Sequence, residues 1–154
     1  MKSALATVMT LALAACTSTP TRPLARVECH RPPFSTNVVG PALIDTSDRV
    51  APIAADAALF LDRHLERQIA VQNVSATRLR AGAVRVTARL ANCTAGDHAV
   101  RLRTSFLDAA LRPAEATSAW QTVFVPRHGL ALYDETSLGS GGATHYLIEI
   151  AAND

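Results

Sequence analysis

The sequence predicts an all-β protein, an antiparallel β-sandwich of six to seven short strands. Apolar and polar residues alternate with a period of two in several segments, as in strands that bury one face and expose the other. Turn-forming residues separate these segments at intervals of about 10–15 residues, a spacing typical of sandwiches rather than of sheets with helical crossovers. The fold class follows from these two observations.

The clearest strand spans residues 83–90. Its apolar residues fall on one face and its polar residues on the other, with Val84, Val86, Ala88 and Leu90 opposite Arg85, Thr87 and Arg89. Residues 92–97, Asn-Cys-Thr-Ala-Gly-Asp, have the composition of a turn. The alternation then resumes in residues 98–107, through Val100, Leu102, Thr104 and Phe106. We therefore predict that the two segments pair as a β-hairpin.

Two further strands are expected between this hairpin and a glycine-rich loop at residues 138–142. Trp120, Thr122 and Phe124 lead the first of them, and Leu130 and Leu132 share a face of the second. The last strand spans residues 145–151. Its alternation predicts that it buries Tyr146, Ile148 and Ile150.

The segments before the hairpin are less regular. Residues 65–79 contain a strand with Ile69, Val71 and Val74. Residues 54–62 fit either a strand near 58–61, which we favour, or an amphipathic helix. The predicted core combines apolar residues from all the clear strands: Val84, Val86, Leu90, Leu102, Phe106, Trp120, Phe124, Tyr146 and Ile148.

The N-terminus has the pattern of a bacterial lipoprotein signal peptide. Lys2 precedes a short apolar stretch that ends in Leu13-Ala14-Ala15-Cys16, and small residues before a cysteine mark the cleavage and lipidation site. We expect residues 1–15 to be removed and Cys16 to be acylated, which anchors the chain to the membrane. Thr17, rather than Asp, follows the cysteine and favours the outer membrane.

Proline, serine and threonine are frequent after the cysteine, which predicts an extended tether over residues 16–50. The β-sandwich domain then spans residues 51–154. Several apolar residues within the predicted tether leave open that part of it packs on the domain: Phe34, Val38, Val39, Leu43 and Ile44.

Composition and motifs exclude several classes of function. The formal net charge is only +2, too small for a nucleic-acid binder. The five histidines, His30, His64, His98, His128 and His145, show no metal-ligand spacing. No catalytic motif of a hydrolase or phosphate-binding loop is present. We therefore expect neither an enzyme nor a metal or cofactor.

One predicted surface feature involves four arginines. If residues 83–92 and 98–107 pair, Arg85, Arg89, Arg101 and Arg103 crowd one face of the hairpin. Like charges on neighbouring strands are destabilising, so this face is either neutralised, with Glu149 or Asp62 as candidate partners, or it binds an anionic partner.

Two cysteines remain after Cys16 is lipidated. The bacterial periplasm is oxidising, so Cys29 and Cys93 are expected to form a disulfide. This bond would join the predicted tether to the end of the clearest strand and shorten the reach of the domain.

The pattern resembles the YcfL-type lipoproteins. Four features carry the resemblance: the strand from Val84 to Asn92, Phe106-Leu107-Asp108, the lone Trp120, and Tyr146-Leu147-Ile148. A departure is Asp108-Ala109-Ala110-Leu111, where such domains usually have a turn with glycine at the fourth position. The resemblance implies an immunoglobulin-like β-sandwich on the periplasmic face of the outer membrane and no catalytic residues.

We therefore expect a lipid-anchored, non-enzymatic interaction module of the bacterial outer membrane. Its partner would be an envelope protein or a cell-wall component. The alternative is a lipoprotein subunit of a secretion or envelope-assembly machine.

Overall fold

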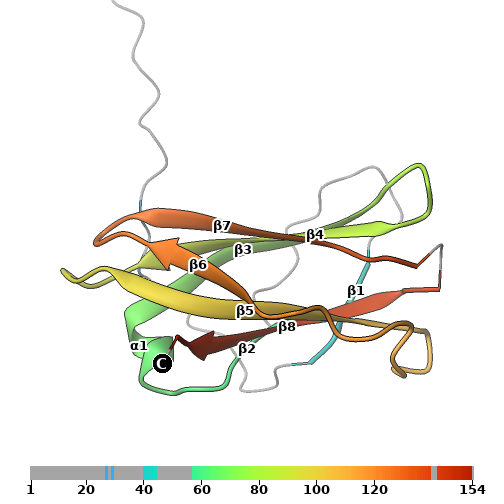
Figure 1. Ribbon diagram of the computed structural model, residues 1–154, viewed down its shortest axis with the longest axis horizontal. Coiled ribbons are helices and arrows are strands. Elements are labelled where there is room, and N and C mark those ends of the chain that lie inside the picture. Colours follow the sequence, from blue (N-terminus) through green and yellow to red (C-terminus); the bar gives the residue numbers. More distant parts are fainter. Residues whose placement is uncertain (1–26, 28, 30–39, 45–56, 140–141, 154) are drawn as a thin grey trace, which may run out of the picture.

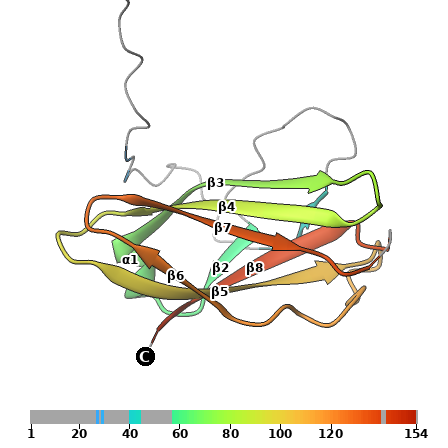
Figure 2. The same cartoon turned by 45° about the horizontal axis from the view of Figure 1, so that its top comes forward.

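Two sheets packed face to face form the protein (Figures 1 and 2). The computed structural model describes residues 27, 29, 40–44, 57–139 and 142–153. Sheet A contains β1 (Ala42–Leu43), β2 (Ala58–Phe60), β5 (His98–Leu107), β6 (Gln121–Val125) and β8 (His145–Ala152). Sheet B contains β3 (Ile69–Arg78), β4 (Val84–Asn92) and β7 (Leu130–Thr136). The predicted antiparallel β-sandwich is confirmed.

The strand order is β1-β8-β5-β6 in sheet A and β3-β4-β7 in sheet B. All pairs are antiparallel except that of β2 with β8. β1 and β2 lie along the same edge of β8, β1 beside His145 and Tyr146 and β2 beside Ile148 to Ile150. These two short strands from the N-terminal part of the described chain therefore cover the edge of β8.

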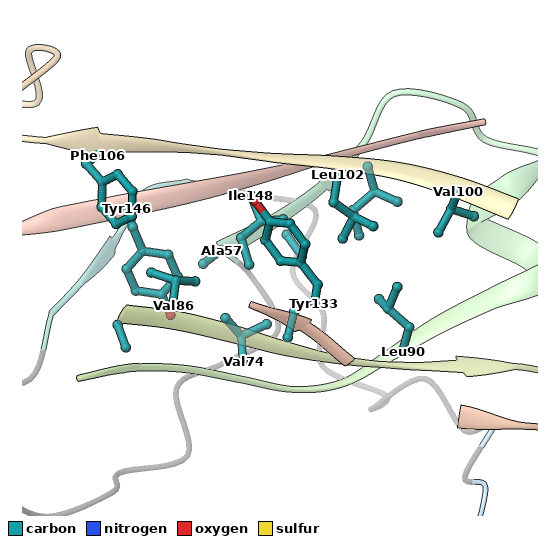
Figure 3. Close-up of a cluster of buried hydrophobic side chains, with 14 of the residues drawn as sticks. Ala57, Val74, Val86, Leu90, Val100, Leu102, Phe106, Tyr133, Tyr146 and Ile148 are labelled. Atoms are coloured by element: carbon teal, nitrogen blue, oxygen red, sulfur yellow. The ribbon is translucent and has the colours of Figure 1, made fainter. Parts of the chain in front are cut away.

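The core lies between the sheets (Figure 3). Alternate residues of β4, β5 and β8 fill it, as their sequence pattern predicts; the fully buried members include Val84, Val86, Leu90, Val100, Leu102, Phe106, Tyr146, Ile148 and Ile150. Tyr133 of β7 is also buried, and its hydroxyl lies 2.9 Å from Thr104 Oγ1. Burying apolar area of this kind is the main source of stability in a domain of this size.

The predicted hairpin of residues 83–92 and 98–107 is wrong. Both segments are strands, but β4 pairs with β3 and β7, whereas β5 pairs with β6 and β8. Residues 93–97 carry the chain from sheet B to sheet A. A period of two identifies the buried face of a strand but not its neighbour, and strands in opposite sheets of a sandwich bury the same kind of face.

The face assigned to β6 is also wrong. Phe124 is 61% exposed and Leu132 is 66% exposed, whereas Val125 and Tyr133 are buried. Trp120 lies outside the core, where its ring contacts arginines on the outer face of sheet A. Since β6 is at the edge of sheet A, exposed apolar residues there reversed the apparent alternation.

The ordered domain begins before residue 51, where the sequence placed its boundary. β1 pairs with β8, and Ile44 is only 3% exposed, so this part of the predicted tether packs on the domain. The strand favoured near residues 58–61 is present as β2. Residues 65–68 form one helical turn, α1 (Leu65–Gln68), before β3 begins. The signal peptide, Cys16, Phe34, Val38 and Val39 lie outside the described residues.

Candidate interaction surfaces

The described part of the chain brings no three His, Cys, Asp or Glu side chains together in a way that could hold a metal. His64 Nε2 contacts Gln68 Nε2, and His98 Nε2 contacts Thr94 Oγ1 at 2.9 Å. These contacts hold a helical turn and a loop in place. The features that could act in recognition are therefore the outer faces of the two sheets and the loops at their ends.

The outer face of sheet A has an aromatic and charged cluster around Trp120. Arg103 donates from Nε to Glu149 Oε2 at 2.6 Å across the β5–β8 pair. The guanidinium carbon of Arg103 lies 4.4 Å from the centre of the Trp120 ring, within the range of a cation–π contact. The hydrogen bond to Glu149 raises the pKa of Arg103. We call Arg101, Arg103, Trp120 and Glu149 the Trp120 cluster.

Arg101 is the less constrained cation of this cluster. Its guanidinium carbon lies 5.7 Å from the centre of the Trp120 ring, and its Nε donates to the Ala152 carbonyl at 3.1 Å. No carboxylate among the described residues pairs with Arg101. Arg103, by contrast, is paired with Glu149, whose side chain is only 18% exposed. Arg101 can therefore bind an external carboxylate or phosphate without breaking an ion pair.

The outer face of sheet B has a more exposed arrangement. Arg85 donates from Nε to both carboxylate oxygens of Asp134, at 2.8 and 2.9 Å. The hydrogen bond and the charge of Asp134 raise the pKa of Arg85. The two side chains are 56% and 41% exposed, so water screens the pair and it contributes little to stability. Arg89 lies opposite Leu132 and has no carboxylate partner in the described chain.

The four predicted arginines therefore do not form one face. Arg85 and Arg89 lie on sheet B, and Arg101 and Arg103 lie on sheet A. Glu149 is a partner, as the sequence suggested, but Asp62 instead accepts a hydrogen bond from the backbone N–H of His64. The pairing of Arg85 with Asp134 and the position of Trp120 could not be predicted from the sequence, since both depend on strand pairing.

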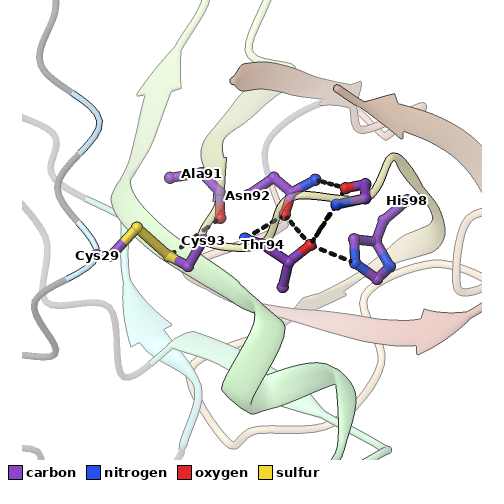
Figure 4. The surroundings of a disulfide bond; sticks show 7 residues. Cys29, Ala91, Asn92, Cys93, Thr94 and His98 are labelled. Carbon is purple, nitrogen blue, oxygen red and sulfur yellow. Dashed lines mark hydrogen bonds between the residues drawn. A yellow bond between two sulfur atoms is a disulfide. The ribbon is translucent and has the colours of Figure 1, made fainter. Parts of the chain in front are cut away.

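Cys29 and Cys93 form the predicted disulfide, with Cα atoms 5.6 Å apart (Figure 4). Cys93 follows β4 directly, and its N–H donates to the carbonyl of Gln68 at the end of α1. The neighbouring Asn92 is fully buried. Its amide donates to the carbonyls of Gly96 and Val125, and its Oδ1 accepts from the N–H and hydroxyl of Thr94.

We call this part of the sandwich the disulfide end; it contains α1 and residues 93–97 and 126–129. The loops that cross between the sheets here are joined by hydrogen bonds. His128 N–H donates to the Thr94 carbonyl, and Arg127 N–H donates to Asp97. Cys29 is thus joined covalently to this end of the domain.

Comparison with a solved structure supports the fold. The solved structure of Campylobacter jejuni cj0090 is similar, with a TM-score of 0.50 and 14% identity over 63% of this chain and 98% of that chain. A DUF1425 family member from Shewanella sp. pv-4 gives a TM-score of 0.49 and 13% identity over 56% and 79% of the two chains. No family model and no curated protein sequence matches the chain.

At this level of identity the similarity concerns the fold alone. The described helical segment is far too short to cross a bilayer.

Proposed function

We propose that the chain is a lipid-anchored, non-enzymatic binding module on the periplasmic face of the bacterial outer membrane, of the YcfL type, and that the Trp120 cluster binds its partner. The partner is an envelope protein or a cell-wall component with anionic groups. The anchor is Cys16, whose sequence context is that of a lipidated cysteine.

The observation that supports this proposal best is the combination of Trp120 and Arg101 on an outer sheet face. Tryptophan and arginine are the residues that most often dominate binding energy at protein interfaces. Arg103 and Glu149 neutralise each other beneath the ring, so they hold Trp120 in place. Arg101 remains available beside it, so an anionic group bound to Arg101 would lie next to the indole.

The position of the disulfide fits an anchored module. Cys29 follows Cys16 by 13 positions, and a fully extended segment of that length spans about 45 Å at most. Because Cys29 is bonded to Cys93, this distance, rather than that of the whole predicted tether, limits how far the disulfide end can move from the lipid.

Cross-linking in intact cells, followed by identification of the captured molecule, tests the proposed surface. We expect Arg101→Glu to reduce capture strongly, because it places a negative charge where an anion should bind. Arg89→Glu is the matched control, since Arg89 lies on the opposite sheet and no described carboxylate pairs with it. Equal loss of capture in the two variants, or a lowered melting temperature that accompanies the loss in Arg101→Glu, would contradict the proposal.

The identity of the captured molecule decides between the two roles predicted from the sequence. A component of a secretion or envelope-assembly machine would make the protein a subunit of that machine. The anchor is tested separately with Cys16→Ser. This change should abolish labelling by a palmitate analogue and release the protein from the membrane fraction.

A further inference from the structure

Four exposed leucines lie at the end of the sandwich opposite the disulfide. Leu79 follows β3, Leu111 lies between β5 and β6, Leu138 lies between β7 and β8, and Leu43 of β1 pairs with the first residue of β8. Their exposed fractions are 38%, 52%, 97% and 63%, in that order. The connecting loops lie on the right in Figure 1, away from α1 and the C-terminus. We call this part of the domain the leucine end.

Leu111 is held in a conformation that disfavours leucine. Its φ is 59°, in the left-handed region that glycine adopts without strain. The turn is fixed by Asp108, whose carboxylate accepts from the N–H groups of Ala110 and Arg112 and from the Arg112 guanidinium. An exposed, strained apolar residue is a reason to look for a function at that position.

Leu138 is also held outward by polar contacts. Glu115 accepts from the N–H of Leu138 at 3.1 Å and from that of Gly139 at 2.7 Å. The Arg78 guanidinium donates hydrogen bonds to the carbonyls of Gly82 and Ala143 and so joins two loops of this end. The leucines are therefore presented by a connected set of loops rather than collapsed onto the surface.

The charges at this end favour an anionic partner. The carboxylates of Asp108 and Glu115 are both occupied by hydrogen bonds within the loops. Arg80 is exposed and has no acidic partner in the described segments, and the Arg112 side chain is 77% exposed. Phosphate groups at a membrane surface attract arginines in such positions.

We propose that the leucine end docks on an anionic phospholipid surface, that of the bilayer that holds the acylated Cys16. The leucines insert between the lipids, and Arg80 and Arg112 bind phosphates. Each leucine comes from a different segment, and insertion into a fluid apolar layer requires no shape complementarity among them. Exposed apolar clusters mark either protein or membrane interaction sites. Beside the separate leucines lie Arg80, which has no acidic partner in the described segments, and Arg112, which is paired with Asp108 but remains 77% exposed; these cations favour lipid here.

The reach of the anchor allows this docking and rests on the proposed lipidation. The ten-residue strand β5 is about 33 Å long, less than the roughly 45 Å that the 13 positions between Cys16 and Cys29 can span. The domain can therefore lie along the bilayer and bring its leucine end to the same surface. Docking at both ends would hold the Trp120 cluster at a fixed height above the lipid.

Co-sedimentation with vesicles tests the proposal. The mature chain with Cys16→Ser lacks acyl chains, so binding reports the leucine end alone. We expect it to bind vesicles of phosphatidylcholine and phosphatidylglycerol more tightly than vesicles of phosphatidylcholine. Adding Leu111→Asn and Leu138→Ser should weaken binding by at least about tenfold, the effect of losing one buried leucine; asparagine tolerates the left-handed conformation.

The matched control replaces the exposed apolar residues Phe124 and Leu132 by serine, because they are 61% and 66% exposed but lie on strands away from this end. It should leave vesicle binding unchanged. Absence of binding by the unmodified leucine end, or equal weakening in the control, would overturn the proposal. So would leucine variants that lose cross-linking to a protein but still bind vesicles. Loss of partner capture by Arg101→Glu tests the Trp120 cluster separately.

Discussion

The two ends of the sandwich hold their loops in different ways. At the disulfide end, buried Asn92 fixes the loops from inside, and the Cys29–Cys93 bond ties Cys29 to the end of β4. At the leucine end, the polar side chains of Arg78, Asp108 and Glu115 hold the loops while apolar side chains point outward. The contacts at the disulfide end stabilise the fold. Those at the leucine end hold the loops so that apolar side chains stay exposed, although these side chains add little to the core.

The largest difference between the ends should come from the disulfide. Replacing both Cys29 and Cys93 by serine opens a loop with a sequence separation of 64, which should lower the free energy of unfolding by about 2–4 kcal/mol. Urea denaturation of the oxidised protein and of the variant measures the effect. Reductant should bring the unmodified protein to the stability of the variant, and an unchanged midpoint without reductant would show that the bond contributes nothing.

Removing the buried Asn92 side chain at the disulfide end should destabilise the fold more than removing the Glu115 side chain at the leucine end. Asn92→Ala removes a buried side chain with four hydrogen bonds and takes this donor from the buried Val125 carbonyl, which should cost about 2–3 kcal/mol. Glu115→Ala exposes the N–H groups of Leu138 and Gly139 to water and should cost less than about 1 kcal/mol. Equal losses in chemical denaturation would remove the distinction between the ends.

The two buried tyrosines of the core also differ in whether their hydroxyls have a hydrogen-bond partner. The Tyr133 hydroxyl is paired with Thr104, whereas the buried Tyr146 hydroxyl has no hydrogen-bond partner among the described residues, and burial raises its pKa. Tyr133→Phe should therefore destabilise by about 1–2 kcal/mol, whereas Tyr146→Phe should be neutral or stabilising. Thermal unfolding of the two variants compares them directly; a comparable loss in both would indicate that Tyr146 has a partner.

Much of the fold could be predicted because alternation reports burial. The pattern of Val84 to Leu90, of Val100 to Phe106 and of Tyr146 to Ile150 identified the inner faces of β4, β5 and β8 correctly. The cysteine pair could also be predicted, since the expected compartment is oxidising and only two thiols remain.

The arrangement of the strands could not be predicted in the same way. Whether residues 93–97 make a hairpin or cross between sheets depends on contacts such as that of Asn92 with Val125, which are distant in sequence. The position of Trp120 follows from the pairing of β5 with β8, which places Arg103 beside Glu149. The leucine end could not be predicted from the sequence either, because its leucines belong to four separate segments.

Leu111 bears on both the stability of the fold and the proposed lipid contact. The sequence already shows that its turn has leucine where glycine is usual. Relief of its left-handed conformation gains about 1–2 kcal/mol, and the greater freedom of unfolded glycine takes back about 0.5–1 kcal/mol. Leu111→Gly should therefore raise the free energy of unfolding by up to about 1 kcal/mol. The side chain is 52% exposed, so little packing is lost.

The same change should weaken binding to anionic vesicles, because it removes one inserting leucine. His128 provides the control at the other end of the sandwich, since its φ of 48° is also left-handed but its side chain is not apolar. His128→Gly should raise stability without affecting vesicle binding. If Leu111→Gly neither stabilises the fold nor weakens the binding, its strained conformation has no relation to lipid, and the contrast between the two ends reduces to the disulfide and Asn92.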